Sequence, residues 1–282
     1  MTTTSSSGAL TLDKAFGSIM LVGAGKMGGA MLEGWLALGL APHSVVVIEP
    51  QPSGEITMLA GRGVRINPTP ASVGAVAAIV IAVKPQVAPD IVPALAAYLG
   101  PATAVVSIMA GRPLGFLHSW LGQNTAIVRA MPNTPAAIGR GITVAVPSIG
   151  VSAAQRELVH ALLSSTGAVE WITDETLMDA VTAVSGSGPA YVFLLAEALA
   201  RAGVAAGLPA ELASRLARAT VAGSGELLHR SPLDPATLRQ NVTSPGGTTA
   251  AALAVLMGPD GLDPVLTKAV IEATRRSREL AG

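Results

Sequence analysis

A glycine-rich turn at residues 23–28 is the first feature of the sequence that could support chemistry. It reads Gly-Ala-Gly-Lys-Met-Gly, directly after an apolar run and at the start of a helical pattern. Glycines permit a tight turn and let backbone amides approach a pyrophosphate, which also benefits from the helix N-terminus. The pattern alone could be a plain glycine turn. Its place in the first strand–helix–strand unit predicts a dinucleotide site.

A carboxylate, Glu49, ends the second predicted strand, 21 residues after Gly28. An acidic side chain at this place typically accepts hydrogen bonds from the adenosine ribose hydroxyls, and it would repel a 2′-phosphate. The next arginines are Arg62 and Arg65. The expected cofactor is therefore NAD(P)H, with NADH preferred, unless Glu49 is an ordinary solvated carboxylate.

Three further polar or proline-rich loops follow predicted strands. They are AVKPQ at 82–86, SIMAG at 107–111 and RAMPNTP at 129–135, which carries Asn133 and Thr134. In open α/β sheets the ligand crevice lies beyond the carboxyl ends of the strands, so these loops would line one crevice. Simple termination of the strands could also account for the prolines.

Two glycine-containing runs stand out in the second half of the chain. DAVTAVSGSGPAY occupies 179–191, and its Pro189 suits the first turn of a helix. SPGGTT at 244–249 precedes the helical run AAALAVLM, and free amides and hydroxyls at a helix N-terminus suit a carboxylate. The alternatives are an ordinary helix start and a capped helix behind a glycine loop.

The elements that must position these residues alternate in type up to residue 172. Alternation of this kind predicts an α/β fold with a parallel sheet and helices on both faces. Strands are expected at 19–25, 45–50, 64–66, 77–85, 102–110, 126–132, 142–147 and 168–172, and helices at 26–40, 56–63, 87–98, 114–121 and 153–165. From residue 174 the pattern is helical only. Residues 1–15 are expected to form a disordered leader.

The predicted helix at 189–206 is apolar on nearly every side, with Glu197 and Arg201 its only charges. A helix that is hydrophobic all round must be buried all round. A helical domain of about 110 residues can barely bury it alone, so a subunit interface is expected.

Composition narrows the function classes. Lys plus Arg number 18 and Asp plus Glu 18, so a neutral chain offers no electrostatic footprint for nucleic acid. Cysteine is absent, which excludes disulfides and cysteine chemistry, and no metal site is expected. The uncharged stretch 91–111 is interrupted by Pro93, Gly100 and Pro101, so no membrane span and a cytoplasmic location are expected.

Taken in this order and spacing, these motifs resemble the pyrroline-5-carboxylate reductase family across residues 17–280. The resemblance implies a Rossmann dinucleotide-binding domain at 16–172 and an all-helical dimerisation and substrate domain at 173–282. It also implies NAD(P)H-dependent reduction of 1-pyrroline-5-carboxylate to L-proline by a homodimer or a higher oligomer of dimers.

The resemblance also implies roles for individual residues. The expected cofactor contacts, together with Glu49, are Gly23, Ala24, Gly25, Lys26, Met27, Gly28, Ala82, Val83, Lys84, Pro85, Ile108, Met109 and Ala110. The expected substrate contacts are Ser244, Gly247, Thr248 and Thr249, with Thr249 bonded to the imine nitrogen, and Glu175 near the substrate of the partner chain. Family members often carry a small polar or basic residue where this chain has Glu49, which leaves the choice between NADH and NADPH open.

Two other functions compete. A β-hydroxyacid dehydrogenase of the 6-phosphogluconate type is expected to carry a catalytic lysine on the long helix between its domains, but this chain has no lysine between Lys84 and Lys268. An imine can take its proton from water, so an imine reductase needs no such group. A catalytically silent dinucleotide sensor would explain the nucleotide fold and the apolar helix, but it gives no reason for SPGGTT.

Overall fold

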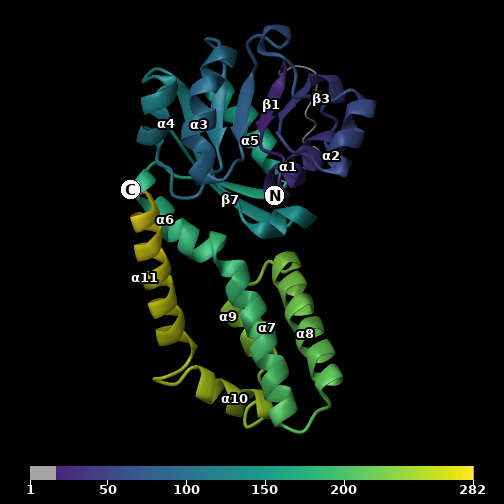
Figure 1. Ribbon diagram of the computed structural model, residues 1–282. Helices are drawn as coiled ribbons and strands as arrows, with labels where there is room; N and C mark the ends of the chain where they lie inside the picture. The colour runs from purple at the N-terminus through teal and green to yellow at the C-terminus, as the bar shows by residue number, and fades with distance from the viewer. Residues whose placement is uncertain (1–16, 282) are drawn as a thin grey trace, which may run out of the picture. The chain divides into compact units, whose positions relative to one another are not determined.

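The computed structural model describes residues 17–281, so the expected leader lies outside the described residues. The chain divides into two compact units (Figure 1). The first unit runs to Gly186 and takes in the chain again from Arg275. The second unit is Ser187–Thr274.

The first unit is built on an eight-stranded sheet with the order β3-β2-β1-β4-β5-β6-β7-β8. The first six positions follow the Rossmann order, in which the chain reverses direction across the sheet between β1 and β4. The strands are β1 Ile19–Val22, β2 Val45–Ile48, β3 Arg65–Ile66, β4 Ala78–Ile81, β5 Ala104–Ser107, β6 Ala126–Met131, β7 Gly141–Pro147 and β8 Gly167–Trp171.

Two strands, β7 and β8, depart from the predicted parallel sheet, because they run opposite to the other six. β7 pairs with β6 antiparallel, whereas the other neighbouring pairs are parallel. Only residues 132–140 join β6 to β7. A parallel return requires a crossover of a dozen residues or more, so this short connection forces the chain back alongside β6.

Helices cover both faces of the sheet, as predicted. Alternate residues of each central strand point to opposite faces, so Leu21 and Met20 belong to different buried clusters. One face packs on α1 Lys26–Ala37, α2 Gly54–Leu59 and α5 Ala153–Ser164. The other packs on α3 Ala88–Ile91, the 3-10 helix η6 Val92–Tyr98 and α4 Leu114–Leu121.

The helix predicted at 87–98 is divided in two. α3 ends at Ile91, and η6 begins at Val92, one residue before Pro93. A proline lacks the amide hydrogen that an α-helix needs, and its ring clashes with the carbonyl four residues earlier. The chain therefore continues as a tighter 3-10 helix.

The last sheet strand, β8, ends at Trp171, and a helical connection follows it within the first unit. This connection comprises the 3-10 turn η8 Glu175–Leu177, α6 Met178–Val181 and a π-turn at Thr182–Gly186. Ser277 from the end of α11 (Leu262–Ala281) donates its hydroxyl to Asp179 Oδ1 at 2.7 Å. The C-terminal end of the chain is thereby bonded to the segment that leads out of the sheet.

The second unit is helical throughout its regular structure. It contains α7 Gly188–Ala205, α8 Ala210–Arg230, α9 Pro235–Asn241, α10 Thr248–Leu256 and α11 as far as Thr274. α7 and α8 pack side by side (Figure 1), but no residue of α7 is buried. The continuous helical segment Glu175–Ala205 is long and apolar enough, by length and composition alone, to cross a membrane.

Candidate active site

The glycine-rich turn follows β1 and lies against the loop that follows β4, at the carboxyl edge of the sheet. Gly23 has φ +91°, and a Cβ there would meet Ala82 O at 2.8 Å and Val83 Cγ1 at 2.9 Å. A Cβ on Gly28 would lie 2.1 Å from Gly23 O. The first and third glycines are thus required by the packing of the protein itself, since any side chain there would displace backbone.

The middle glycine has a different environment. A Cβ on Gly25 would meet no atom within 4 Å, so the space beside it is open. Gly25 is also the N-cap of α1, whose first turn has no side-chain cap and no acidic residue. Unpaired amides beside an open space suit a pyrophosphate that approaches the backbone closely. The residues present therefore fit a dinucleotide.

Glu49 lies at the end of β2 and contacts the glycine-rich turn. Its Oε2 accepts the Ala24 amide at 2.9 Å, and its Oε1 accepts the Gln51 amide at 3.1 Å. A carboxylate has about four lone-pair directions, so two remain for further donors. The carboxylate is thus held in place without being saturated, as a ribose-binding group needs.

The loop after β5 uses its side chains unequally. Ser107 is buried, and its hydroxyl accepts the Met109 amide at 3.3 Å. Met109 is 3% exposed and packs in the core, Ile108 packs against the opposite core cluster, and Ala110 is exposed. Of these three expected cofactor contacts, Met109 could serve only through its backbone.

The expected cofactor contacts in the other two loops also differ in exposure. Lys26 and Lys84 are exposed, and Met27 and Pro85 are half-buried.

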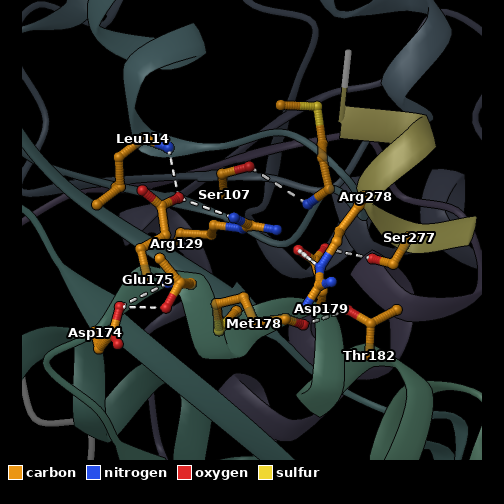
Figure 2. Close-up of polar contacts among 12 residues, drawn as sticks. Ser107, Leu114, Arg129, Asp174, Glu175, Met178, Asp179, Thr182, Ser277 and Arg278 are labelled. Carbon is orange, nitrogen blue, oxygen red and sulfur yellow. Dashed lines mark hydrogen bonds and ion pairs between the residues drawn. The ribbon is translucent and has the colours of Figure 1, made fainter. Parts of the chain in front are cut away.

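Glu175 takes part in a polar network inside the first unit (Figure 2). Its Oε1 accepts the Arg129 guanidinium at 2.9 Å and the Leu114 amide at 2.8 Å. Arg129 comes from the buried strand β6, and Leu114 is the first residue of α4. One carboxylate therefore joins β6 to the helix that follows the SIMAG loop. Whether it also reaches a substrate in a partner chain stays a prediction.

The SPGGTT turn lies in the second unit, before α10. Gly247 is the N-cap of α10, and no side chain caps the helix. The Thr248 and Thr249 hydroxyls make no hydrogen bond to any described residue, and Ser244 is exposed. Uncapped amides with two neighbouring hydroxyls can receive a carboxylate and one additional acceptor. A helix capped by a threonine would require a hydrogen bond from the side chain to the first turn of α10, and no such bond is present among the described residues.

A cavity of about 900 Å³ lies at the opposite edge of the sheet. It is lined near the strand starts by Ala77, Thr103 and Ala126, and farther out by Asn124 and Gln155. No candidate site residue lines it. Since ligands of such sheets bind beyond the carboxyl ends of the strands, this cavity is a poor match for the cofactor.

Sequence reasoning missed two residues. Arg129 is a charged residue in a buried strand, which signals a hidden partner, because buried charges are rarely left unpaired. Asn67 follows β3, and its side chain bonds both backbone polar groups of Glu49 at 2.8 Å. The Asn67-Pro68 pair signals a turn but says nothing of its partner.

Known families match both parts of the chain. Residues 175–280 match the family model described as pyrroline-5-carboxylate reductase dimerisation. Residues 18–111 match the model described as NADP oxidoreductase, coenzyme F420-dependent.

Individual relatives match most of the chain. The pyrroline-5-carboxylate reductase of Pseudomonas aeruginosa is 41% identical over 266 residues, which cover 93% of this chain and 96% of the relative. That of Synechocystis is 40% identical over 262 residues, covering 92% and 97%.

Solved structures agree. The Coxiella burnetii pyrroline-5-carboxylate reductase superposes with a TM-score of 0.87 at 31% identity, covering 95% of this chain and 99% of that one. The Plasmodium falciparum pyrroline carboxylate reductase, solved with NADP bound, gives 0.78 at 29%, covering 94% and 98%. Identity of this level along nearly the whole of both chains shows that this chain belongs to the pyrroline-5-carboxylate reductase family.

Proposed function

We propose that this protein reduces 1-pyrroline-5-carboxylate to L-proline with NAD(P)H, the last step of proline biosynthesis. The observation that carries the proposal is the uncapped SPGGTT turn, which offers amides and two threonine hydroxyls at the start of α10. Neither a β-hydroxyacid dehydrogenase nor a silent dinucleotide sensor needs this combination. Membership of the family supports the same reaction.

The proposed reaction requires little acid–base catalysis by the protein. Bound NAD(P)H supplies the hydride that adds to the imine carbon. The Gly247 and Thr248 amides hold the substrate carboxylate, where the N-terminal partial charge of α10 favours an anion. The Thr249 hydroxyl oxygen accepts a hydrogen bond from the protonated ring nitrogen and so orients the imine. The proton on that nitrogen comes from water before the hydride arrives.

The proposed cofactor site uses the carboxyl edge of the sheet. The amides that follow Gly25 bind the pyrophosphate, and Glu49 accepts the adenosine ribose hydroxyls. A 2′-phosphate would face this carboxylate, so NADH is the preferred cofactor. The discrimination should be about 1–3 kcal/mol, the scale of one charged contact.

The exposed faces of α7 support a dimer. Phe193 is 63% exposed, Leu194 56% and Leu195 52% in the single chain. Such a set of large apolar side chains calls for a covering surface, and the family model that matches this region is named for dimerisation. We infer that a second copy covers α7 in a homodimer. A cytoplasmic location and assembly of dimers into larger oligomers stay predictions.

Oxidation of NADH in the presence of pyrroline-5-carboxylate tests the function directly. The absorbance of NADH should fall in step with proline formation, and a β-hydroxy acid with NAD should give no signal. The same assay with NADPH measures cofactor preference. A protein that binds NADH but does not oxidise it with this substrate would instead be the dinucleotide sensor.

A further inference from the structure

Asn67 adopts an unusual backbone conformation beside the proposed ribose site. It follows β3, an edge strand of the sheet, and has φ +47°, the one positive value among the described non-glycine residues. Its amide donates to Val47 O at 2.8 Å, which extends the pairing of β3 with β2. Asparagine tolerates the left-handed region better than most residues, but the conformation still needs a compensating contact.

That contact is a pair of hydrogen bonds to a single residue. Asn67 Oδ1 accepts the Glu49 amide at 2.8 Å, and Asn67 Nδ2 donates to Glu49 O at 2.8 Å. In an extended strand the side chain would point to one face of the sheet. The left-handed turn instead directs it along the edge to the backbone of the neighbouring strand, so one amide side chain holds both backbone polar groups of Glu49.

The Glu49 carboxylate is held separately, by the Ala24 and Gln51 amides. Asn67 fixes the backbone from which the carboxylate projects, and these amides fix its two oxygens. We propose that Asn67 is a positioning residue for cofactor selection, which acts by aiming the Glu49 carboxylate at the adenosine ribose. This inference rests on the ribose contact of Glu49 in the proposed function.

Two substitutions separate the hydrogen bonds from the backbone conformation. Asn67→Gly keeps the positive φ without strain but removes both side-chain bonds. Asn67→Asp keeps an acceptor for the Glu49 amide and tolerates the same conformation, but it loses the donor to Glu49 O and adds a like charge. Since its added charge would itself repel a 2′-phosphate, Asn67→Asp is compared by the KM for NADH, which should fall between the values of the native protein and Asn67→Gly.

The experiment compares kcat/KM for NADH and NADPH in the native protein, Asn67→Gly, Glu49→Ala and the double variant. Asn67→Gly should lower the NADH-to-NADPH ratio roughly 5- to 20-fold, the scale of one or two lost hydrogen bonds. The loss should lie in the KM for NADH. Binding of reduced nicotinamide mononucleotide, which lacks adenosine, should be unchanged, as measured by its fluorescence.

The double variant tests whether Asn67 acts through Glu49. In the Glu49→Ala background, Asn67→Gly should change the ratio less than about 2-fold, because coupled residues are not additive. An equal loss in both backgrounds would indicate a merely structural role and overturn the proposal. A shift with Glu49→Ala but none with Asn67→Gly overturns the role of Asn67 alone. No shift with Glu49→Ala overturns the proposed ribose contact, and the inference with it.

Discussion

We expect the two partners of the Arg129–Glu175 ion pair to differ in how much their substitution destabilises the fold. Their side chains are 6% and 29% exposed, and the charged atoms lie 2.9 Å apart. Glu175→Ala would leave the guanidinium buried without its partner. Arg129→Met would remove the buried charge and fill much of its volume, leaving the more exposed carboxylate to water and to the Leu114 amide.

The magnitudes follow from this difference in burial. Breaking a buried pair from one side costs about 3–5 kcal/mol, and the partial exposure of Glu175 reduces this to about 2–4 kcal/mol. Arg129→Met should cost about 1–2 kcal/mol, because replacing buried ionic groups by apolar ones of similar volume is often tolerated. At about 2 °C per kcal/mol for a chain of this size, Glu175→Ala should lower Tm by about 4–8 °C.

Thermal unfolding followed by circular dichroism tests this ordering. Protein concentration must be equal in all samples, because assembly makes Tm concentration-dependent. Glu175→Gln is the matched control, since it keeps an acceptor for the Leu114 amide and for Arg129. The double variant, which combines Arg129→Met with Glu175→Ala, should be little less stable than Arg129→Met alone. Additive losses in the double variant, or a larger loss with Arg129→Met than with Glu175→Ala, would refute the reasoning.

Three further predictions test separate parts of the molecule. Thr249→Ala should lower kcat/KM roughly 10- to 1000-fold with NADH binding retained, and Thr249→Ser should keep much of the activity; near-normal turnover by the alanine variant would remove Thr249 from the mechanism. Ala198→Glu places a charge on α7 and should halve the mass seen by light scattering or unfold the protein, whereas a fully active native monomer would contradict the interface. Hydrogen bonds from the Thr237 amide and hydroxyl lower the pKa of Asp234, the N-cap of α9. Its carboxylate therefore stabilises the fold above its unfolded pKa, and this contribution is lost as the pH falls through the lower folded value. The side chain introduced by Asp234→Asn does not titrate, so the stability of this variant should depend less on pH in the acid range. Unfolding curves recorded at a series of pH values measure this difference.

The sequence by itself determined the classes of element and the expected cofactor edge. The alternation of apolar strands with helical runs was enough to predict a Rossmann-type sheet covered on both faces, because strand and helix periodicities are local properties. The glycine turn could be located because its residues are contiguous. The structure shows that the three glycines have different environments. Gly23 and Gly28 pack against protein atoms, whereas Gly25 faces open space.

The local sequence pattern does not predict the structure where the length of a connection between elements overrides the propensities of the residues. β7 has the composition of any buried strand, and its direction depends on the short loop before it. The helix predicted at 87–98 was divided by Pro93, a signal that was present in the sequence. The direction of β7 depends on topology, whereas the break at Pro93 is a property of the local sequence.

Only the tertiary structure decided which polar groups meet. Glu175 bonds Arg129 across 46 positions, Asp179 bonds Ser277 across 98, and Asn67 bonds Glu49 across 18. Each pair joins different elements, so no helical or strand period relates its members. A hydrogen bond depends on distances within a few tenths of an ångström, and such distances are set by how the elements pack rather than by the order of residues along the chain.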